Sequence, residues 1–293
     1  MVEVAIISGK GGTGKSIISA ALASLSRQVL LADCDVDAAN LYLIFDPVHE
    51  EEQVYIGSKH AIIDPNLCNS CGLCQEYCRF GAILDDGGQM IVSEILCDGC
   101  QLCSRICPRR AIRMIENNKS RMFAGPFRNG WMVYGKLAPG EENSGKLVNL
   151  VRDKARKLAK KHQIGTIIID GPPGIGCSAI SSITGADHVV IVTEPSLTGL
   201  HDLKRVHEMV SAFSLKAWVI INKADLNPVM ASQIEDFCVA NGITLAGQLP
   251  FDPLVVEAMV QCKSITEWAP EADISKEIIG IWRTITGLNE LNE

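Results

Sequence analysis

The chain has 293 residues, which is enough for one large or two modest domains with a sizeable core. Hydrophobic residues make up 47% and charged residues 21%, a composition that excludes a disordered or collagen-like protein. The 34 acidic residues outnumber the 27 basic ones, and the net charge of -7 argues against a dedicated nucleic-acid or anionic-membrane binder. The chain begins directly with a strand-like run and has no leader pattern, so we expect a cytoplasmic protein.

The first 55 residues predict a strand, a helix and a second strand. Residues 2–7, apolar except for Glu3, are typical of a buried strand, a glycine-rich turn follows, and residues 16–25 have the alanine and leucine pattern of a helix. A second strand is expected over residues 29–32. Strands without polar alternation then alternate with helices, which indicates an α/β fold with a mostly parallel sheet and helices on both faces. The later helices are expected at 147–161 and 199–212, and the later strands at 165–170, 188–192 and 217–221.

That rhythm stops between residues 56 and 116, where cysteines replace the apolar runs. The chain has twelve cysteines, and eight of them lie between Cys68 and Cys107. In a cytoplasmic chain such crowding favours metal binding over disulfides. Segments 68–83 and 97–112 match at seven of sixteen positions, 29 residues apart, and so form an internal repeat. We therefore expect a small inserted domain at 56–116, and a main domain formed by residues 1–55 and 117–293.

The glycine-rich turn fits the P-loop pattern G-x-x-x-x-G-K-[ST] between a strand and a helix. In a P-loop, backbone N–H groups curl around phosphate, Lys15 reaches the terminal phosphates and Ser16 ligates Mg²⁺. The turn also fits the dinucleotide pattern G-x-G-x-x-G, with Asp33 about twenty residues further on. Lys15 and Ser16 favour the P-loop, because a dinucleotide turn needs neither an amine nor a hydroxyl there. The expected phosphate-binding residues are Gly11, Gly12, Thr13, Gly14, Lys15 and Ser16.

A second lysine, Lys10, makes the match narrower. Residues 10–16 resemble the deviant Walker A motif of the MinD/ParA/Mrp ATPases and of the nitrogenase iron protein. The resemblance implies that Lys10 reaches the nucleotide of a partner subunit, so the protein forms a homodimer, or a heterodimer with a similar ATPase. The segment after the second strand resembles the first switch of these families, which implies that Asp33 lies near Mg²⁺ and that Asp35 orients the attacking water. Lys10, Lys15 and Asp35 are therefore the expected catalytic residues.

The strand at 165–170 resembles the Walker B strand of the same families, running into their second switch. By this resemblance Asp170 holds Mg²⁺ through water, and the N–H of Gly174 senses the γ-phosphate. The expected magnesium site is thus formed by Ser16, Asp33 and Asp170.

The nucleotide base is expected to lie near two later loops. Asn222 and Asp225 fit the N-K-x-D pattern with which GTPases read guanine, although MinD-like families place an asparagine here against adenine. Pro250 and Asp252 resemble the second base-contacting loop of those families. We favour ATP over GTP.

Two cysteine runs have the spacing C-x2-C-x2-C-x3-C of bacterial ferredoxins, in which the fourth cysteine of each run ligates the other cluster. Three thiolates at this spacing wrap one cubane face, and the crossover supplies the fourth corner. We therefore expect the insert to be a bacterial-ferredoxin-like α+β domain with two [4Fe-4S] clusters. Zinc is the alternative, but zinc sites normally pair two separated C-x-x-C units. Cluster one would be held by Cys68, Cys71, Cys74 and Cys107, and cluster two by Cys78, Cys97, Cys100 and Cys103.

Three weaker signals are read as structural. The six basic residues at 152–161 are expected to form a solvated helix face, with a ParA-type DNA contact as the alternative. Only Lys276 and Arg283 are basic in the C-terminal apolar helix, which argues against MinD-like membrane targeting. Cys177 follows Asp170 at the spacing of a cluster ligand in the nitrogenase iron protein, but without a matching second cysteine we expect a buried structural residue. We therefore expect no nucleic-acid and no membrane partner.

The sequence as a whole resembles MinD-superfamily P-loop ATPases that carry an inserted two-cluster ferredoxin domain. This resemblance implies an ATPase whose nucleotide cycle gates electron transfer, in an anaerobe, to a redox or metallocofactor-assembly protein. An ATP-dependent carrier or scaffold for an iron-sulfur or other metal cluster is the alternative. A ParA/MinD-like spatial organiser is a third class, which would need a basic or amphipathic docking surface.

Overall fold

The computed structural model describes residues 1–142 and 145–287, so the last six residues of the expected main domain lie outside the described residues. The chain divides into two compact units. The sheet unit comprises Met1–Glu52, Met122–Gly135 and Ser144–Glu293, and the cysteine unit comprises Gln53–Arg121 and Lys136–Asn143. The second segment of the cysteine unit has no counterpart in the insert expected at 56–116.

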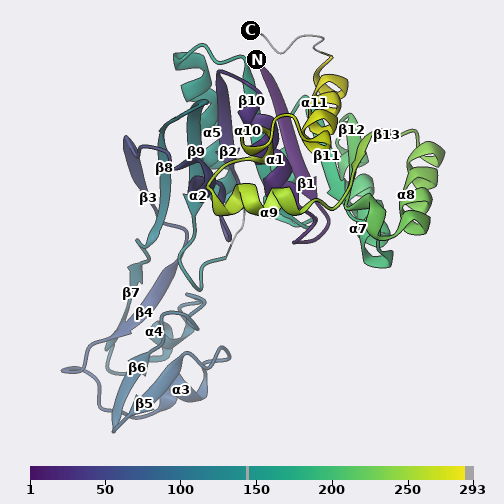
Figure 1. The fold of residues 1–293 in the computed structure, drawn as a ribbon. Coiled ribbons are helices and arrows are strands. Elements are labelled where there is room, and N and C mark those ends of the chain that lie inside the picture. Colours follow the sequence, from purple (N-terminus) through teal and green to yellow (C-terminus); the bar gives the residue numbers. More distant parts are fainter. Residues whose placement is uncertain (143–144, 288–293) are drawn as a thin grey trace. The chain divides into compact units, whose positions relative to one another are not determined.

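Seven parallel strands form the main part of the sheet. They are β1 (Val2–Ser8), β2 (Val29–Asp33), β9 (Gly130–Lys136), β10 (Thr166–Pro173), β11 (His188–Thr193), β12 (Ala217–Asn222) and β13 (Thr244–Leu249). Adding β3 (Glu51–Tyr55) and β8 (Ser120–Phe127) gives nine strands in the order β13-β12-β11-β1-β10-β2-β9-β8-β3 (Figure 1). The expected mostly parallel sheet is confirmed. The last three strands of that order, and β13 at the opposite edge, extend the sheet beyond the strands expected from the sequence.

Helices lie on both sides of this sheet (Figure 1). Side chains of α1 and α11 pack with Ile6, Ile168 and Val190 of the central strands in one apolar core. These three strand residues share one face of the sheet, because successive side chains of a strand point to opposite faces. The helices are α1 (Lys15–Ser24), α2 (Leu41–Phe45), α5 (Lys146–Lys161), α6 (Cys177–Ile183), α7 (Leu197–Ala212), α8 (Pro228–Ala240), α9 (Pro253–Val260), α10 (Ile265–Trp268) and α11 (Asp273–Thr286), with a short 3-10 helix at Ala224–Leu226.

The basic helix α5 is only partly a solvated face. Its apolar stripe is buried as expected, but Arg152 is buried with it and is only 3% exposed. The Arg152 guanidinium donates to Glu3 Oε2 and to the C=O groups of Ser181 and Thr184, each at 2.7 Å. Arg156 donates to the same Glu3 carboxylate. The expectation of a fully solvated face is therefore wrong at Arg152, because this side chain neutralises a buried carboxylate and caps the C-terminal carbonyls of α6.

The cysteine unit repeats one pattern of elements twice. The first half contains β4 (Lys59–Ile63), α3 (Leu73–Glu76) and β5 (Ile83–Asp86), and the second contains β6 (Gln89–Val92), α4 (Leu102–Ile106) and β7 (Ile112–Glu116). Strand β4 pairs antiparallel with β7, and β5 pairs antiparallel with β6. Each half therefore supplies a strand to the sheet of the other.

Within residues 1–142 and 145–287, none of the helices combines the length and the apolar character needed to cross a bilayer. The apolar residues of α11, including Ile278, Ile281 and Trp282, are buried, as expected for a packing helix.

Candidate functional site

The P-loop follows β1 and leads into α1. Gly14 has φ 93°, in the left-handed region that favours glycine, and a Cβ at this position would lie 2.2 Å from Nδ2 of Asn222. Helix α1 begins at the next residue, so its N-terminal N–H groups lie at the turn. Backbone groups of this kind form an anion-binding site.

Lys15 lies at the centre of a buried network of carboxylates. Its Nζ is 3.0 Å from Asp170 Oδ1 and 3.5 Å from Asp35 Oδ2, and the side chain is 7% exposed. Ser16 Oγ donates to Asp170 Oδ2, and Ser19 Oγ donates to Asp170 Oδ1, both at 2.7 Å. The structure thus brings together Lys15, Ser16, Asp35 and Asp170 as expected. Ser19 was not expected, although its position one turn after Ser16 places it on the same helix face.

Asp33 completes this network from the end of β2. Its carboxylate is fully buried and accepts the N–H groups of Asp35, Asn40 and Leu41. Burial, together with the Asp170 carboxylate, raises the pKa of Asp33 to about 8, and burial also raises the pKa of Asp35. Burial alone would lower the pKa of Lys15, but Asp170 and Asp35 outweigh it and the pKa is raised. Mg²⁺ is usually held by one or two carboxylates together with substrate phosphates and water, so the oxygen atoms gathered here fit a Mg²⁺ ion that is bound with a nucleotide.

The second lysine of the motif pairs within its own subunit. Lys10 Nζ donates to Glu194 Oε1 at 2.6 Å and to Thr198 Oγ1 at 3.1 Å, just before and within the first turn of α7. Lys223 Nζ lies 3.7 Å from the other oxygen of Glu194 and donates to the C=O of Gly12. Glu194 therefore holds two lysines beside the P-loop, an arrangement that the sequence does not indicate.

A cavity of about 230 Å³ lies beside the P-loop, and Gly12, Gly14, Asn222, Pro250 and Asp252 are among the residues that line it. Asn222 Nδ2 donates to the C=O of Thr13 at 2.8 Å, which ties the cavity wall to the P-loop. Lys223 also lines the cavity, and the rest of its wall is apolar, formed by Ile17, Ile18, Leu249, Phe251, Val255, Val256, Ile265, Ile274 and Ile278. A planar, largely apolar group such as a nucleobase fits such a site.

Two expected nucleotide contacts are engaged within the protein. Asp225 is not among the residues that line this cavity, and its Oδ1 accepts the N–H of Phe251 at 2.6 Å. The N–H of Gly174 donates to the C=O of Ser8 at 2.8 Å. Gly174 has φ 93°, in the left-handed region that favours glycine.

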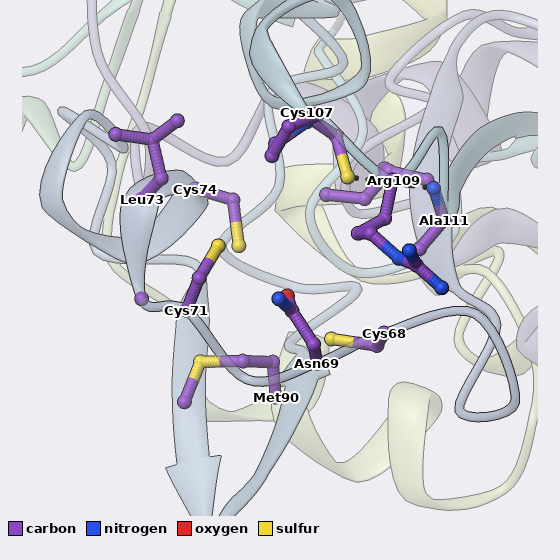
Figure 2. Close-up of a pocket in the computed structure, with 12 residues that line it drawn as sticks. Cys68, Asn69, Cys71, Leu73, Cys74, Met90, Cys107, Arg109 and Ala111 are labelled. Carbon is purple, nitrogen blue, oxygen red and sulfur yellow. Dashed lines mark hydrogen bonds between the residues drawn. The ribbon is translucent and has the colours of Figure 1, made fainter.

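Four cysteines of the cysteine unit surround one pocket. Figure 2 shows the sulfur atoms of Cys68, Cys71, Cys74 and Cys107 directed toward a common space, with Arg109 and Met90 beside it. The first three cysteines belong to the first run, and Cys107 is the fourth cysteine of the second run. Burial, and then the Cys68 and Cys107 thiols, raise the pKa of Cys74.

Fewer contacts define the positions of the other four cysteines, Cys78, Cys97, Cys100 and Cys103. Burial, followed by Cys97 and Cys100, raises the pKa of Cys103, so these three thiols are neighbours. Cys78, Cys97 and Cys103 pack against the small apolar core of the unit. In the part of the chain that the structure describes, no group of three His, Cys, Asp or Glu side chains is arranged to hold a single metal ion. A cubane cluster differs from a single ion because each cysteine binds a different corner.

The two cysteine loops share an unusual backbone. Three pairs of residues 29 positions apart have positive φ, and each pair contains one glycine. Non-glycine residues adopt this conformation at a cost of about 1 kcal/mol, so its repetition indicates a required loop shape rather than chance. The pairs are Ser70 and Gly99, Gly72 and Gln101, and Gly81 and Arg110.

Cys177 departs from the expectation. It is exposed at the start of α6, so the expectation that it is a buried structural residue is wrong.

The fold and the P-loop network define a P-loop ATPase of the MinD/ParA type. Residues 4–265 match the family described as the CobQ/CobB/MinD/ParA nucleotide binding domain, and the chain belongs to this family. The chain is similar to two proteins of Methanocaldococcus jannaschii. It is 35% identical to the uncharacterized protein MJ0578 over 78% of this chain and 80% of that protein, and 28% identical to the uncharacterized protein MJ0579 over 96% and 98%.

Among solved structures, the fold is similar to that of the septum site-determining protein MinD of Pyrococcus horikoshii, complexed with Mg-ADP. The TM-score is 0.59 at 19% identity, with 97% of this chain and 96% of that one covered.

Proposed function

We propose that this protein is an ATPase that dimerises around nucleotide and couples its ATP cycle to electron transfer through two [4Fe-4S] clusters in the cysteine unit. The observation that carries the proposal is the pocket formed by Cys68, Cys71, Cys74 and Cys107. A cysteine from the other run completes this set, which is the crossover that two-cluster ferredoxins require. The antiparallel exchange of strands between the two halves supports the same architecture.

The nucleotide is ATP in this proposal, bound with Mg²⁺. Asp225 is occupied by the Phe251 N–H and lies outside the cavity lining, which counts against the guanine contact of GTPases. Ser16, Asp33 and Asp170 would hold Mg²⁺, in keeping with the Mg-ADP complex of the similar MinD. The metal supplies charge neutralisation for the phosphates when bound.

The remaining roles belong to side chains of the chain itself. Lys15 would neutralise the terminal phosphates, Asp35 would orient the attacking water and Gly174 would donate its N–H to the γ-phosphate. Lys10 would leave Glu194 to reach the nucleotide of the partner subunit. The partner is a second copy or a similar ATPase.

In the cysteine unit, the clusters would supply one-electron storage and transfer when bound. Cys68, Cys71, Cys74 and Cys107 would hold cluster one, while Cys78, Cys97, Cys100 and Cys103 would hold cluster two. Backbone N–H groups of Ser70 and Ala111 donate to the sulfur atoms of Cys68 and Cys107 at 3.4 Å, and such bonds stabilise thiolate charge.

A chain of contacts leads from the nucleotide network toward the segment that enters the cysteine unit. Asp33 accepts the N–H of Leu41, the first residue of α2, and Tyr42 of that helix stacks on Tyr134 with ring centroids 5.0 Å apart. Tyr134 Oη is 2.8 Å from Nε2 of His49, which lies four residues before the cysteine unit begins. Movement of the Asp33 loop on nucleotide exchange would be passed through this aromatic cluster to the chain segment that leads into the insert.

Metal and sulfide analysis tests the cluster proposal first. Protein purified without oxygen should be brown and contain about eight iron and eight sulfide per chain. Near-stoichiometric zinc without sulfide would overturn it.

Coupling is tested by the midpoint potentials of both clusters in an Asp35→Asn variant, with ADP and with ATP. If ATP binds the reduced form tenfold more weakly than the oxidised form, while ADP binds both forms equally, the potential with ATP is lower by about 59 mV, because the linkage is reciprocal. Potentials that agree within about 10 mV, together with unchanged access of a chelator to the iron, would leave the insert as a tethered electron carrier.

A MinD-like spatial organiser is the second candidate, favoured by the similarity to a septum site-determining protein. The apolar side chains of α11 are buried in the core rather than available to a bilayer. ATP-dependent cosedimentation with anionic vesicles would favour this organiser. Transfer of iron and sulfide to an apo-protein in the presence of ATP would instead favour the carrier or scaffold.

A further inference from the structure

The two halves of the cysteine unit differ in charge at equivalent positions. Asn69, beside Cys68, corresponds to Asp98, beside Cys97, 29 residues later. At the corner that follows the fourth cysteine, Arg109 and Arg110 of the second half correspond to Phe80 and Gly81 of the first. The repeat therefore places an added acid beside one set of cysteines and two added arginines beside the other.

Arg109 belongs to the pocket of cluster one, and Arg110 is the next residue in the chain. Arg109 lines that pocket together with the four cysteines (Figure 2), and its Nε donates to the C=O of Leu67 at 3.4 Å. Arg110 is exposed and has φ 51°, where the equivalent Gly81 has φ 63°. Among the described residues, no carboxylate forms an ion pair with Arg109 or Arg110, so their charges are not cancelled locally.

The equivalent corner of the first half, which follows Cys78 of the cluster-two set, carries less net charge. Arg79 follows Cys78 and lies over the Phe80 ring at 4.8 Å, while Asp98 on the same cysteine set carries the opposing charge. The other charged pair of the loops, Glu76 and Arg105, lies on α3 and α4, which pack against each other and so do not distinguish the two sets.

The two sets of cysteines also differ in the hydrogen bonds that their sulfur atoms accept, and this difference again favours reduction of cluster one. The cluster-one cysteines accept backbone N–H groups from Ser70 and Ala111, both at 3.4 Å. The cluster-two cysteines accept the N–H of Ala61 at Cys97, at 3.5 Å, and the Ser104 N–H at Cys103, which is matched by the Gln75 N–H at Cys74 of cluster one. Positive charge and N–H donors both favour the reduced form of an iron-sulfur centre, which carries one more negative charge.

We propose that the cluster held by Cys68, Cys71, Cys74 and Cys107 has the higher reduction potential of the two, and is where an electron in the cysteine unit comes to rest. Arg109 and Arg110 on one side and Asp98 on the other set this direction. One electron leaves the cluster-two site and enters the cluster-one site, so one cluster is oxidised as the other is reduced, and no further reactant is needed. This inference rests on the proposed function, since it needs both clusters.

The test is a potentiometric titration of the full-length protein, followed by electron paramagnetic resonance. Arg109→Gln should lower the higher of the two midpoint potentials, and Asp98→Asn should raise the lower one, so that the gap narrows in both variants. A tenfold change in the ratio of reduced to oxidised cluster corresponds to about 59 mV. Arg113→Gln is the matched control, because Arg113 is exposed and next to Ile112, so it points to the other face of β7 from a residue that lines the pocket.

The outcomes separate the two proposals. Protein without iron and sulfide would overturn the proposed function. Fully loaded protein in which Arg109→Gln moves the lower potential, or moves neither more than Arg113→Gln does, would overturn this inference and leave the proposed function standing.

Discussion

Glu194→Gln should strengthen the ATP-bound dimer. In the structure Glu194 binds Lys10 at 2.6 Å, and in the proposed dimer Lys10 would have to leave Glu194 to reach the nucleotide of the other subunit. Removing the carboxylate also leaves Lys10 close to Lys223, whose ammonium lies 3.7 Å from the same carboxylate, and the two like charges repel. Both effects favour a Lys10 side chain that has left position 194 and can reach the other subunit of the proposed dimer.

The magnitude follows from the exposure of the pair. Lys10 is 32% and Glu194 is 23% exposed, and an ion pair of this kind contributes about 0.5–1 kcal/mol. A dimer breaks two such pairs, so the variant should dimerise with a gain of about 1–2 kcal/mol, a factor of about 5 to 30 in the dissociation constant.

Sedimentation velocity with saturating ATP measures this constant, with Asp35→Asn in both proteins to prevent hydrolysis. Glu208→Gln is the control, because Glu208 is exposed on α7 and removes the same charge. A Glu194→Gln dimer that is no tighter than the reference would refute the reasoning. So would an equal gain in Glu208→Gln.

Three further perturbations have defined outcomes. Lys15→Ala should abolish binding of a fluorescent ATP analogue, because it removes the ammonium group that Asp170 holds and that would neutralise the terminal phosphates. Gly14→Ala should weaken that binding at least tenfold, because of the positive φ and the clash with Asn222. Glu3→Gln should lower the free energy of unfolding at pH 7 by about 3 kcal/mol, because it leaves Arg152 buried without its carboxylate.

The controls for these variants use the same assays. Gly165→Ala should bind nucleotide normally, since a Cβ there meets no atom within 4 Å. For Glu3, burial opposes ionisation but Arg156 and Arg152 outweigh it, so the pKa is lowered in the folded protein. The stabilisation is therefore complete above the ordinary pKa of 4.5 and is lost as the pH falls through the folded value. Urea unfolding followed by tryptophan fluorescence should show the deficit of Glu3→Gln shrinking at pH 4, and a constant deficit would contradict the linkage.

The sequence is sufficient where one local pattern fixes a local shape. The P-loop could be placed because its glycines, Lys15 and the following helix lie in one segment, and Asp170 because a buried strand leads directly to it. The strands of residues 120–136 were missed as sheet members, although the apolar run around Trp131 and Val133 has strand character. They attach to a sheet edge that no local pattern identifies.

Contacts between distant segments could not be predicted where neither a motif nor the repeat marks the two residues. Glu194 is separated from Lys10 by 184 residues, and nothing near either residue marks the pair. Arg152 looked like one of six solvated basic residues, because burial of a single arginine depends on a carboxylate on β1. In the cysteine unit the repeat itself made the long-range prediction possible, since spacing within each run implied a partner in the other.

The exchange of strands between the two halves of the cysteine unit also affects how the chain folds during synthesis. Ile63 at the end of β4 pairs with Ile112 of β7, so it has no pairing partner until about fifty more residues have been synthesised. At the usual speed of the ribosome this delay is about 2 to 10 seconds. For most of that interval the ribosome has already added Cys68, Cys71 and Cys74 but not yet Cys107. The nascent chain then carries three thiols of the set without the fourth. These three thiols are therefore open to oxidation during synthesis, and the first half cannot complete its fold until the second half has been made.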